Sequence, residues 1–451
     1  MKIFWGLILV TGVAVFSVWP MVMRMDRVAD YGKDGMFLAT VQMNWHQKIS
    51  DYIRHKTDPK MSFFDGYFYY AEKNSLAFSD MLFVTSLLTY WPAKLSNNPS
   101  MGAGIGLVMG QVLTMIISYA IFVKMSKSIT GAVIGSIAFG LSQIHFMYQV
   151  HLHTWTMQYW LLGYWLFGQR RYALSGVFLG LQMWESPLGV YFALIMIAVK
   201  LISYRLSISQ LAKNLNSLVI FFIVIGVVAY LPAKAYWDVS RFYGYVRTIR
   251  DAAYHGLSIN DLDGFVSPGL FVLFILGIYG VIRFQTPNFK YVLLVIITSY
   301  ILALGPVLKW DGKTVKIGGI IPVPLPYAAA YYTIPGWQAF RVPSRWLVVT
   351  GWGMAAVIAM AIGKSQKKYL GIIGYLVMAI LGGTRLTKYV DLPREIPAEY
   401  KTTEEVLVFK PMGGEPEEIE RMYFSILAGK KTMNGFSGFI PPNRVKWLNE
   451  K

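Results

Sequence analysis

The chain has 451 residues, of which 55% are hydrophobic and only 15% are charged, and its formal net charge is +18. This composition excludes a soluble globular protein, which would carry more charge and fewer apolar runs, and it predicts an all-α polytopic membrane protein. The positive charge is expected in cytoplasmic loops and beside anionic headgroups rather than on nucleic acid, and the absence of cysteine excludes disulfides, thiolate nucleophiles and Cys-based metal sites.

The N-terminal segment has one lysine followed by an apolar run over 3–23. This run is longer than the apolar region of a usual signal peptide, and no small-residue cleavage site follows it. The segment therefore predicts a retained first helix whose N-terminus is cytoplasmic.

Five of the polar breaks between the later apolar runs are basic. They contain Lys124 and Lys127; Arg170 and Arg171; Arg205 and Lys213; Arg283 and Lys290; and Lys364, Lys367 and Lys368. The positive-inside rule places all five breaks in the cytoplasm. This is possible only if the apolar stretch 79–95 does not cross the membrane and if 172–204 forms two helices hinged near Pro187.

The segment 79–95 has an uninterrupted apolar part too short for a span and ends in Trp-Pro-Ala-Lys, a sequence typical of the membrane interface. The prediction is then about eleven transmembrane helices with a cytoplasmic N-terminus and an extracytoplasmic C-terminus. The expected spans are 3–23, 102–123, 129–147, 152–168, 172–184, 187–204, 216–235, 266–284, 289–305, 344–362 and 369–383.

This topology divides the chain into a transmembrane domain, 1–383, and a small extracytoplasmic C-terminal segment, 384–451. The first outer loop, 24–101, is expected to carry interfacial helices, and the C-terminal segment is expected to form a small strand-and-turn unit on the outer loops. Because the cytoplasmic side has only tight basic turns, chemistry or binding is expected at the outer face.

Two aspartates of the first outer loop are candidate functional residues. Asp34 lies near the start of a predicted amphipathic surface helix that has His46 at its polar edge, and Asp80 opens the non-crossing segment. Each carboxylate can equally serve as a helix cap. A carboxylate that precedes an apolar run at the interface is costly, which raises the case for a function of Asp80.

Three of the six histidines, His145, His151 and His153, occur where a predicted span meets the outer surface. The spacing of His151 and His153 does not place them on one helix face, so it favours a hydrogen-bonding lining over a zinc site; ordinary interfacial histidines are the alternative. Glu185, at the predicted hinge, is a carboxylate at membrane depth and so a candidate, with capping of the next helix as its alternative role.

Arg341 and Arg345 lie four residues apart where the tenth predicted span begins at the outer side. Arginine opposes the dipole at a helix N-terminus, so another interaction is expected to hold this pair. Two guanidinium groups at this spacing suit a phosphate or a pyrophosphate, or else the headgroups of the outer leaflet.

Six motifs occur in an order that resembles the bacterial and archaeal membrane proteins with a GT-C type glycosyltransferase fold. They are GKDG with NWH; FFDGYFYYAEKNSLAFSD; SQIHFMYQVHLHTWTMQYW; LQMWESPLGVYF; LPYAAAYYTIPGWQAFRVPSRW; and NGFSGFIPP. The resemblance extends over essentially the whole chain. It differs from the common pattern in having Lys-Asp-Gly where Gly-Asp is more frequent and in its short C-terminal segment.

The resemblance implies transfer of a sugar from a polyprenyl-phosphate donor to a glycan, lipid or protein acceptor at the outer face of the cell membrane. Asp34 matches the position of the general base and Asp80 that of a second acid. His151, Gln158, Arg341 and Arg345 match polar and basic positions of the family, and His46, His153 and Glu185 are the other substrate-binding candidates. Arginine or a divalent cation would stabilise the leaving phosphate, and the sequence has no strong metal-binding pattern.

Two other functions remain open from the sequence. A transporter or flippase of lipid-linked glycans would be expected to show internal repeats and access from both faces, and no convincing repeat is present. A scaffold that kept the fold and lost activity is the third possibility. Replacing Asp34 by Asn should stop a transferase and leave the other two largely unaffected.

Overall fold

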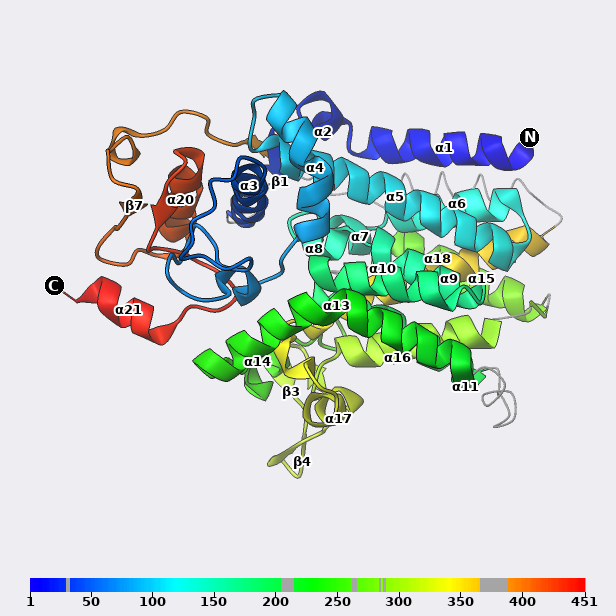
Figure 1. The fold of residues 1–451 in the computed structure, drawn as a ribbon. Coiled ribbons are helices and arrows are strands. Elements are labelled where there is room, and N and C mark those ends of the chain that lie inside the picture. The colour runs from blue at the N-terminus through cyan, green and yellow to red at the C-terminus, as the bar shows by residue number, and fades with distance from the viewer. Residues whose placement is uncertain are drawn as a thin grey trace.

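The computed structural model describes residues 1–29, 33–203, 215–261, 266–283, 285–286, 289–365 and 388–450. Within them the chain is mostly helical, with a few two- and three-residue strands (Figure 1). The expected eleventh span, 369–383, lies outside the described residues, as do Arg205, Lys213, Lys367 and Lys368.

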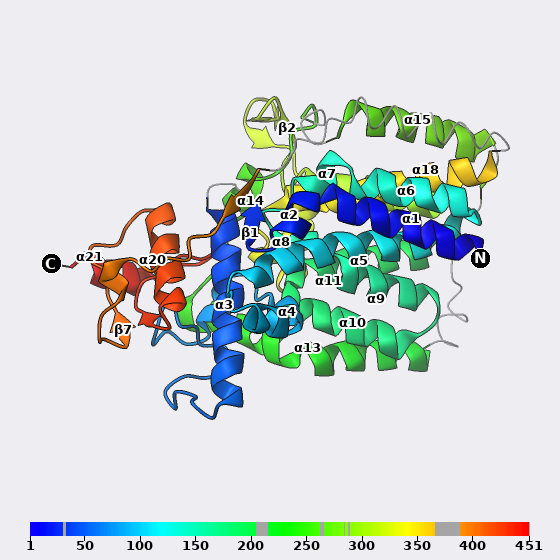
Figure 2. The same ribbon diagram turned by 90° about the horizontal axis from the view of Figure 1, so that it is seen from above.

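Ten helices of the described chain form a bundle whose members run roughly along one direction (Figures 1 and 2). They are α1 (Lys2–Ser17), α5 (Met101–Ser126), α6 (Ile129–Gly140), α9 (Gln158–Gly168), α10 (Tyr172–Glu185), α11 (Pro187–Ser203), α13 (Leu215–Tyr243), α15 (Pro268–Arg283), α16 (Phe289–Ala303) and α18 (Leu347–Lys364). By length and composition, three described helical stretches could cross a membrane: Met101–Ser126, Leu215–Tyr243 and Pro343–Lys364.

Several predicted spans are shorter or more broken than their apolar runs. The run 3–23 is divided at Val18 into α1 and α2 (Trp19–Met23), because Pro20 lacks the backbone N–H that a continuous helix needs. The run 129–147 stops at Gly140, and Ser142 caps the short α7 (Gln143–Phe146). In the run 152–168, α8 (Leu152–Trp155) is separate from α9.

The predicted hinge between two helices in 172–204 is confirmed. Ser186 has an extended backbone, with φ −163° and ψ 133°, between the end of α10 and the start of α11 at Pro187. Proline is favoured in the first turn of a helix because its missing N–H is not needed there. Both helices return to pack on α9.

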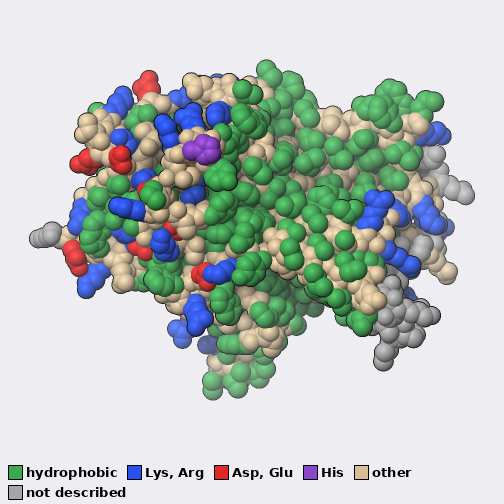
Figure 3. All heavy atoms as spheres, viewed as in Figure 1, with side chains coloured by type: hydrophobic (Ala, Val, Ile, Leu, Met, Phe, Trp, Pro, Cys, Tyr) green, Lys and Arg blue, Asp and Glu red, His purple; other side chains and the backbone are tan. Residues whose placement is uncertain are grey.

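The basic turns that the structure describes gather at the end of the bundle that carries the N-terminus. The Tyr119 hydroxyl of α5 donates to the Ile3 carbonyl at 2.9 Å, and Lys124 bonds Gln169 across the α5–α6 and α9–α10 turns. A Cβ on Gly363 of α18 would lie only 2.7 Å from the Ser126 carbonyl oxygen. Figure 3 shows lysine and arginine side chains at this end, an apolar belt beside it, and charges of both signs at the opposite end.

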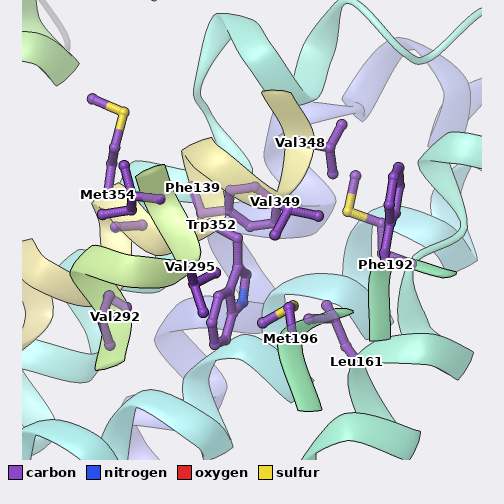
Figure 4. Packing of buried hydrophobic residues seen from close by; sticks show 14 of the residues in the cluster. Phe139, Leu161, Phe192, Met196, Val292, Val295, Val348, Val349, Trp352 and Met354 are labelled. Carbon is purple, nitrogen blue, oxygen red and sulfur yellow. The ribbon is translucent and has the colours of Figure 1, made fainter. Parts of the chain in front are cut away.

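The core of the bundle is centred on α18, which packs on α5, α6, α15 and α16. Figure 4 shows Trp352 of α18 among Phe139, Val295 and Met196, which come from three other helices. The indole N–H of Trp352 is satisfied by the Ser118 hydroxyl at 3.2 Å, so this large side chain is buried without an orphaned donor.

Two helices of the first outer loop lie across the end of the bundle instead of along it, as predicted for interfacial helices. These are α3 (Asp34–Ile53) and α4 (Phe83–Leu95), which pack on each other and on α5 (Figures 1 and 2). The first half of α3 is buried from Gly35 to His46 in a second apolar cluster, distinct from that of the bundle. The segment 79–95 therefore caps the bundle.

The C-terminal segment is joined to the first outer loop. Strand β6 (Tyr389–Asp391) pairs antiparallel with β1 (Arg27–Ala29), and β7 (Val406–Leu407) pairs in parallel with β8 (Lys431–Thr432). The expected strand-and-turn unit also contains two helices, α20 (Glu415–Leu427) and α21 (Pro442–Asn449). Three glutamates in its first turn favour α20 as a helix, and α20 packs on α3.

The remaining described elements connect these units. They are η1 (Ser75–Phe78), α14 (Ile249–Tyr254), β2 (Lys309–Trp310), β3 (Lys313–Thr314), β4 (Lys316–Ile317), β5 (Ile321–Pro322), α17 (Pro326–Thr333), η3 (Trp337–Ala339), η4 (Pro343–Trp346) and η5 (Ala398–Tyr400).

Candidate functional site

Asp34 is the first residue of α3 and is held there by its two neighbours. Lys33 has a left-handed backbone, with φ 73°, and its ammonium group pairs with Glu420 of α20. Gly35 packs so closely that a Cβ would lie 2.4 Å from the Ala29 carbonyl oxygen. The Lys-Asp-Gly sequence thus ties the start of α3 to both β1 and α20, which sets the position of Asp34.

The surroundings of Asp34 make it a weak acid. Burial raises the pKa of the Asp34 carboxyl to about 6, and the negative charge of Glu415 adds to this effect. The positive charges of Arg345 and Arg341 act in the opposite direction. Asp34 is therefore a carboxylate at neutral pH that can accept a proton readily.

Asp80 lies in a short segment between η1 and α4 whose backbone is fixed on both sides. The Tyr236 hydroxyl donates to the Ser79 carbonyl at 3.1 Å, and the Trp45 indole N–H donates to the Met81 carbonyl at 2.6 Å. Burial raises the pKa of Asp80, whereas Arg345 and Ser186 lower it. Its side chain is 20% exposed.

The paired histidines of the sequence prediction lie beside Asp80. The Nε2 atom of His153 is 3.4 Å from an Asp80 carboxylate oxygen, and the rings of His151 and His153 are 5.6 Å apart. Burial and the charge of Arg345 lower the pKa of His151 well below its usual value, so this imidazole is neutral at pH 7. No group of three or more potential metal-ligating His, Asp or Glu side chains occurs among the described residues.

The two arginines enter the site from η4 and the residues before it. The Tyr148 hydroxyl donates to the Ser344 carbonyl at 3.1 Å, and Trp346 stacks on Trp337 with ring centroids 5.7 Å apart, which anchors η4. Neither Arg341 nor Arg345 forms a salt bridge with a described carboxylate. Their guanidinium groups are thus available to an anion.

Five of the predicted site residues interact electrostatically with one another. Arg345 is influenced by Asp34, Asp80 and Arg341, and His151 is influenced by Asp80 and by both arginines. They come from the start of α3, the segment before α4, the α7–α8 link and the η4 region. The fold therefore brings together groups that are far apart in the sequence.

Three other predicted residues are described by their own contacts, and one of them, Glu185, is also influenced by the Asp80 charge. The buried Glu185 carboxylate accepts from the Thr85 backbone N–H at 3.0 Å, and also from the Thr85 hydroxyl and from Thr156. Glu185 thus caps α4 and not α11, the helix that the sequence offered for its capping role. Its oxygens are engaged by protein donors.

His46 is structural in its contacts, whereas the buried side-chain amide of Gln158 has no hydrogen-bond partner among the described residues. The His46 Nε2–H donates to the Ser86 carbonyl at 3.0 Å and contacts the Thr89 hydroxyl at 3.1 Å, which joins α3 to α4. Burial lowers the pKa of His46 to about 4. Gln158 is buried at the start of α9, beside Tyr159.

Sequence reasoning missed three residues that the structure adds to the cluster. The Arg341 charge acts on Tyr245, whose ring carries the Arg247 guanidinium at 5.1 Å from its centroid, and the Arg345 charge acts on Tyr148. A signal for Arg247 was present, because the outer loop 236–265 is rich in arginine against the positive-inside rule.

Comparison with known proteins adds no family to this description. No protein-family model matches the sequence, and a search of curated proteins found no significant match. The cluster itself combines one readily protonated carboxylate, a second carboxylate beside two histidines, and two guanidinium groups that form no salt bridge with a described carboxylate.

Proposed function

We propose that the protein is a GT-C-like membrane glycosyltransferase with about eleven transmembrane helices that transfers a sugar from a polyprenyl-phosphate donor to an acceptor at the outer face. The observation that carries the proposal is the convergence of Asp34, Asp80, Arg341 and Arg345 at the end of the bundle opposite the basic turns. A base and an anion-binding group are what this reaction requires.

In this proposal Asp34 is the general base. Its carboxylate takes the proton of an acceptor hydroxyl, and the acceptor oxygen forms a bond to the anomeric carbon of the sugar. The bond from that carbon to the phosphate oxygen breaks with its electron pair, and the polyprenyl phosphate leaves. Attack from the face opposite the leaving group inverts the anomeric centre.

Arg341 and Arg345 bind the donor phosphate and stabilise the charge that develops on it as the bond breaks. Because neither guanidinium group is neutralised by a described carboxylate within salt-bridge distance, both can turn to a phosphate. Asp80 and His153 would line the acceptor side of the same cluster. The described residues hold no cluster of three metal ligands, and the two guanidinium groups supply positive charge for the phosphate.

The proposal is tested by a turnover assay on the full-length protein in lipid vesicles with a panel of polyprenyl-phosphate sugars. Asp34→Asn is expected to abolish transfer, while Asp238→Asn, at an exposed aspartate paired with Lys234, is the matched control and keeps wild-type turnover. Equal turnover in wild type and Asp34→Asn would refute the role of Asp34. No transfer by well-folded wild type with any donor would refute the enzyme and favour a flippase or scaffold.

A further inference from the structure

The outer segment between α16 and α18 contains a hairpin that the proposed chemistry does not use. Strands β4 and β5 pair antiparallel through Lys316–Pro322 and Ile317–Ile321, around a loop of 318–320. Gly318 and Gly319 have φ of 59° and 76°, a conformation that glycine adopts without strain. The sequence KIGGIIP therefore forms a defined tip.

The base of this hairpin is fixed to the rest of the outer face. The backbone N–H groups of Asp311 and Gly312 donate to Asn260 at 2.7 Å and to Ser258 at 2.9 Å. Behind the tip, the Val323 N–H bonds the Val315 carbonyl at 3.0 Å. The hairpin is consequently a braced projection.

The tip carries large apolar side chains that the rest of the described chain leaves exposed. Ile317, Ile320 and Ile321 are 63%, 79% and 63% exposed. The exposed Lys313 and Lys316 flank them, and Trp310 is also largely exposed. Apolar residues with adjacent lysine and tryptophan are typical of segments that lie in the headgroup region of a bilayer.

The placement of the hairpin supports the same interpretation. Its base follows the end of α16 at Ala303 within a few residues, and η4 leads directly into α18. Figure 1 shows the hairpin projecting crosswise to the bundle axis, at about the same position along that axis as α4. Figure 3 shows apolar side chains at the end of this projection. If the bundle axis crosses the membrane, a projection crosswise to that axis at the position of α4 would run along the membrane surface.

We propose that the 313–322 hairpin is a membrane-surface anchor, in which the isoleucine tip inserts among outer-leaflet lipids and Lys313 and Lys316 bind anionic headgroups. The inference depends on the proposed orientation of the bundle in the membrane and is independent of catalysis at Asp34. The lysines complement a negatively charged lipid, and the only acidic residue of 309–322, Asp311, lies at the braced base and not at the tip.

The absence of cysteine permits a direct test by site-specific labelling of the full-length protein. Ile320→Cys and, as the matched control, Thr403→Cys at an exposed site in the C-terminal segment are labelled with the same fluorophore. Both are reconstituted in vesicles of phosphatidylcholine with and without phosphatidylglycerol. The label at 320 should be quenched several-fold less by aqueous iodide than the label at 403, and more by a nitroxide attached to lipid headgroups.

A charge variant tests the anionic part of the proposal. With both lysines present, phosphatidylglycerol should increase the nitroxide quenching of the label at 320. In the same Ile320→Cys background, Lys313→Glu together with Lys316→Glu should remove this increase. An unchanged increase would overturn headgroup binding by the lysines. Equal iodide quenching at 320 and 403 in both vesicles would overturn insertion and would leave the tip as a surface for another macromolecule. Asp34-dependent turnover is not involved in either outcome.

Discussion

The pH dependence of transfer provides a quantitative test of Asp34 as the base. Because burial and Glu415 raise its pKa to about 6, about 90% of Asp34 is ionised at pH 7 and about 10% at pH 5. The base must be ionised to accept a proton, so kcat/KM should fall by about tenfold between these pH values. An aspartate with an ordinary pKa near 4 would remain mostly ionised and give no such fall.

Two substitutions should move this acidic limb in opposite directions. Glu415→Gln removes a negative charge that raises the pKa of Asp34, so the midpoint should shift to lower pH. Arg341→Gln removes a positive charge that lowers it, so the midpoint should shift to higher pH, whatever happens to the maximal rate. Both shifts should shrink at high salt, because Glu415 and Arg341 are exposed.

The assay is the initial rate of sugar transfer at subsaturating donor, measured from pH 4 to pH 8 (a range of about two units on each side of the expected midpoint). Stability over this range is checked for each variant by its thermal unfolding in the same lipid. A midpoint near 4 in the wild type, or one midpoint shared by all three proteins, would refute the assignment of the limb to Asp34.

Three further predictions concern stability and positioning. The pKa of His46 in the folded protein is about 4, below its unfolded value, so the unfolded chain binds more protons between pH 6.5 and pH 4. The free energy of unfolding should therefore fall by up to about 3 kcal/mol as the pH falls through this window. His46→Gln should flatten that fall, as measured by thermal unfolding. Glu185→Ala leaves buried donors of Thr85 unpaired and should lower the free energy of unfolding by about 3–5 kcal/mol. Glu185→Gln keeps an acceptor for these donors and should cost less. Equal costs of the two substitutions would contradict the role of Glu185 as the cap of α4. Gly35→Ala forces the start of α3 away from Ala29, which should cost about 1–3 kcal/mol and lower turnover. Gly12→Ala, inside α1 with open space around it, should lower neither stability nor turnover.

Local patterns were sufficient for much of the bundle. The hinge before Pro187 was predictable because proline lacks the N–H that a continuous helix uses, and the crosswise position of 79–95 followed from counting basic turns. The breaks within 3–23 and 129–147 were missed because hydropathy records where a segment is apolar, not where its backbone bonds stop. The helix α20 was missed although the sequence carries its signal, since Ile419, Met422, Tyr423 and Ile426 recur at helical spacing.

For the candidate site, the sequence by itself determined the kinds of groups at the outer face, such as the carboxylate of Asp34 and the guanidinium of Arg345. Their electrostatic influence on each other was decided by the tertiary structure, since residues more than 300 positions apart come near each other only in the folded bundle. The same packing gave the Glu185 carboxylate its donors in α4. A carboxylate has the same chemistry wherever it lies in a chain, but its pKa and its role depend on burial and on neighbouring charges, which only the folded chain supplies.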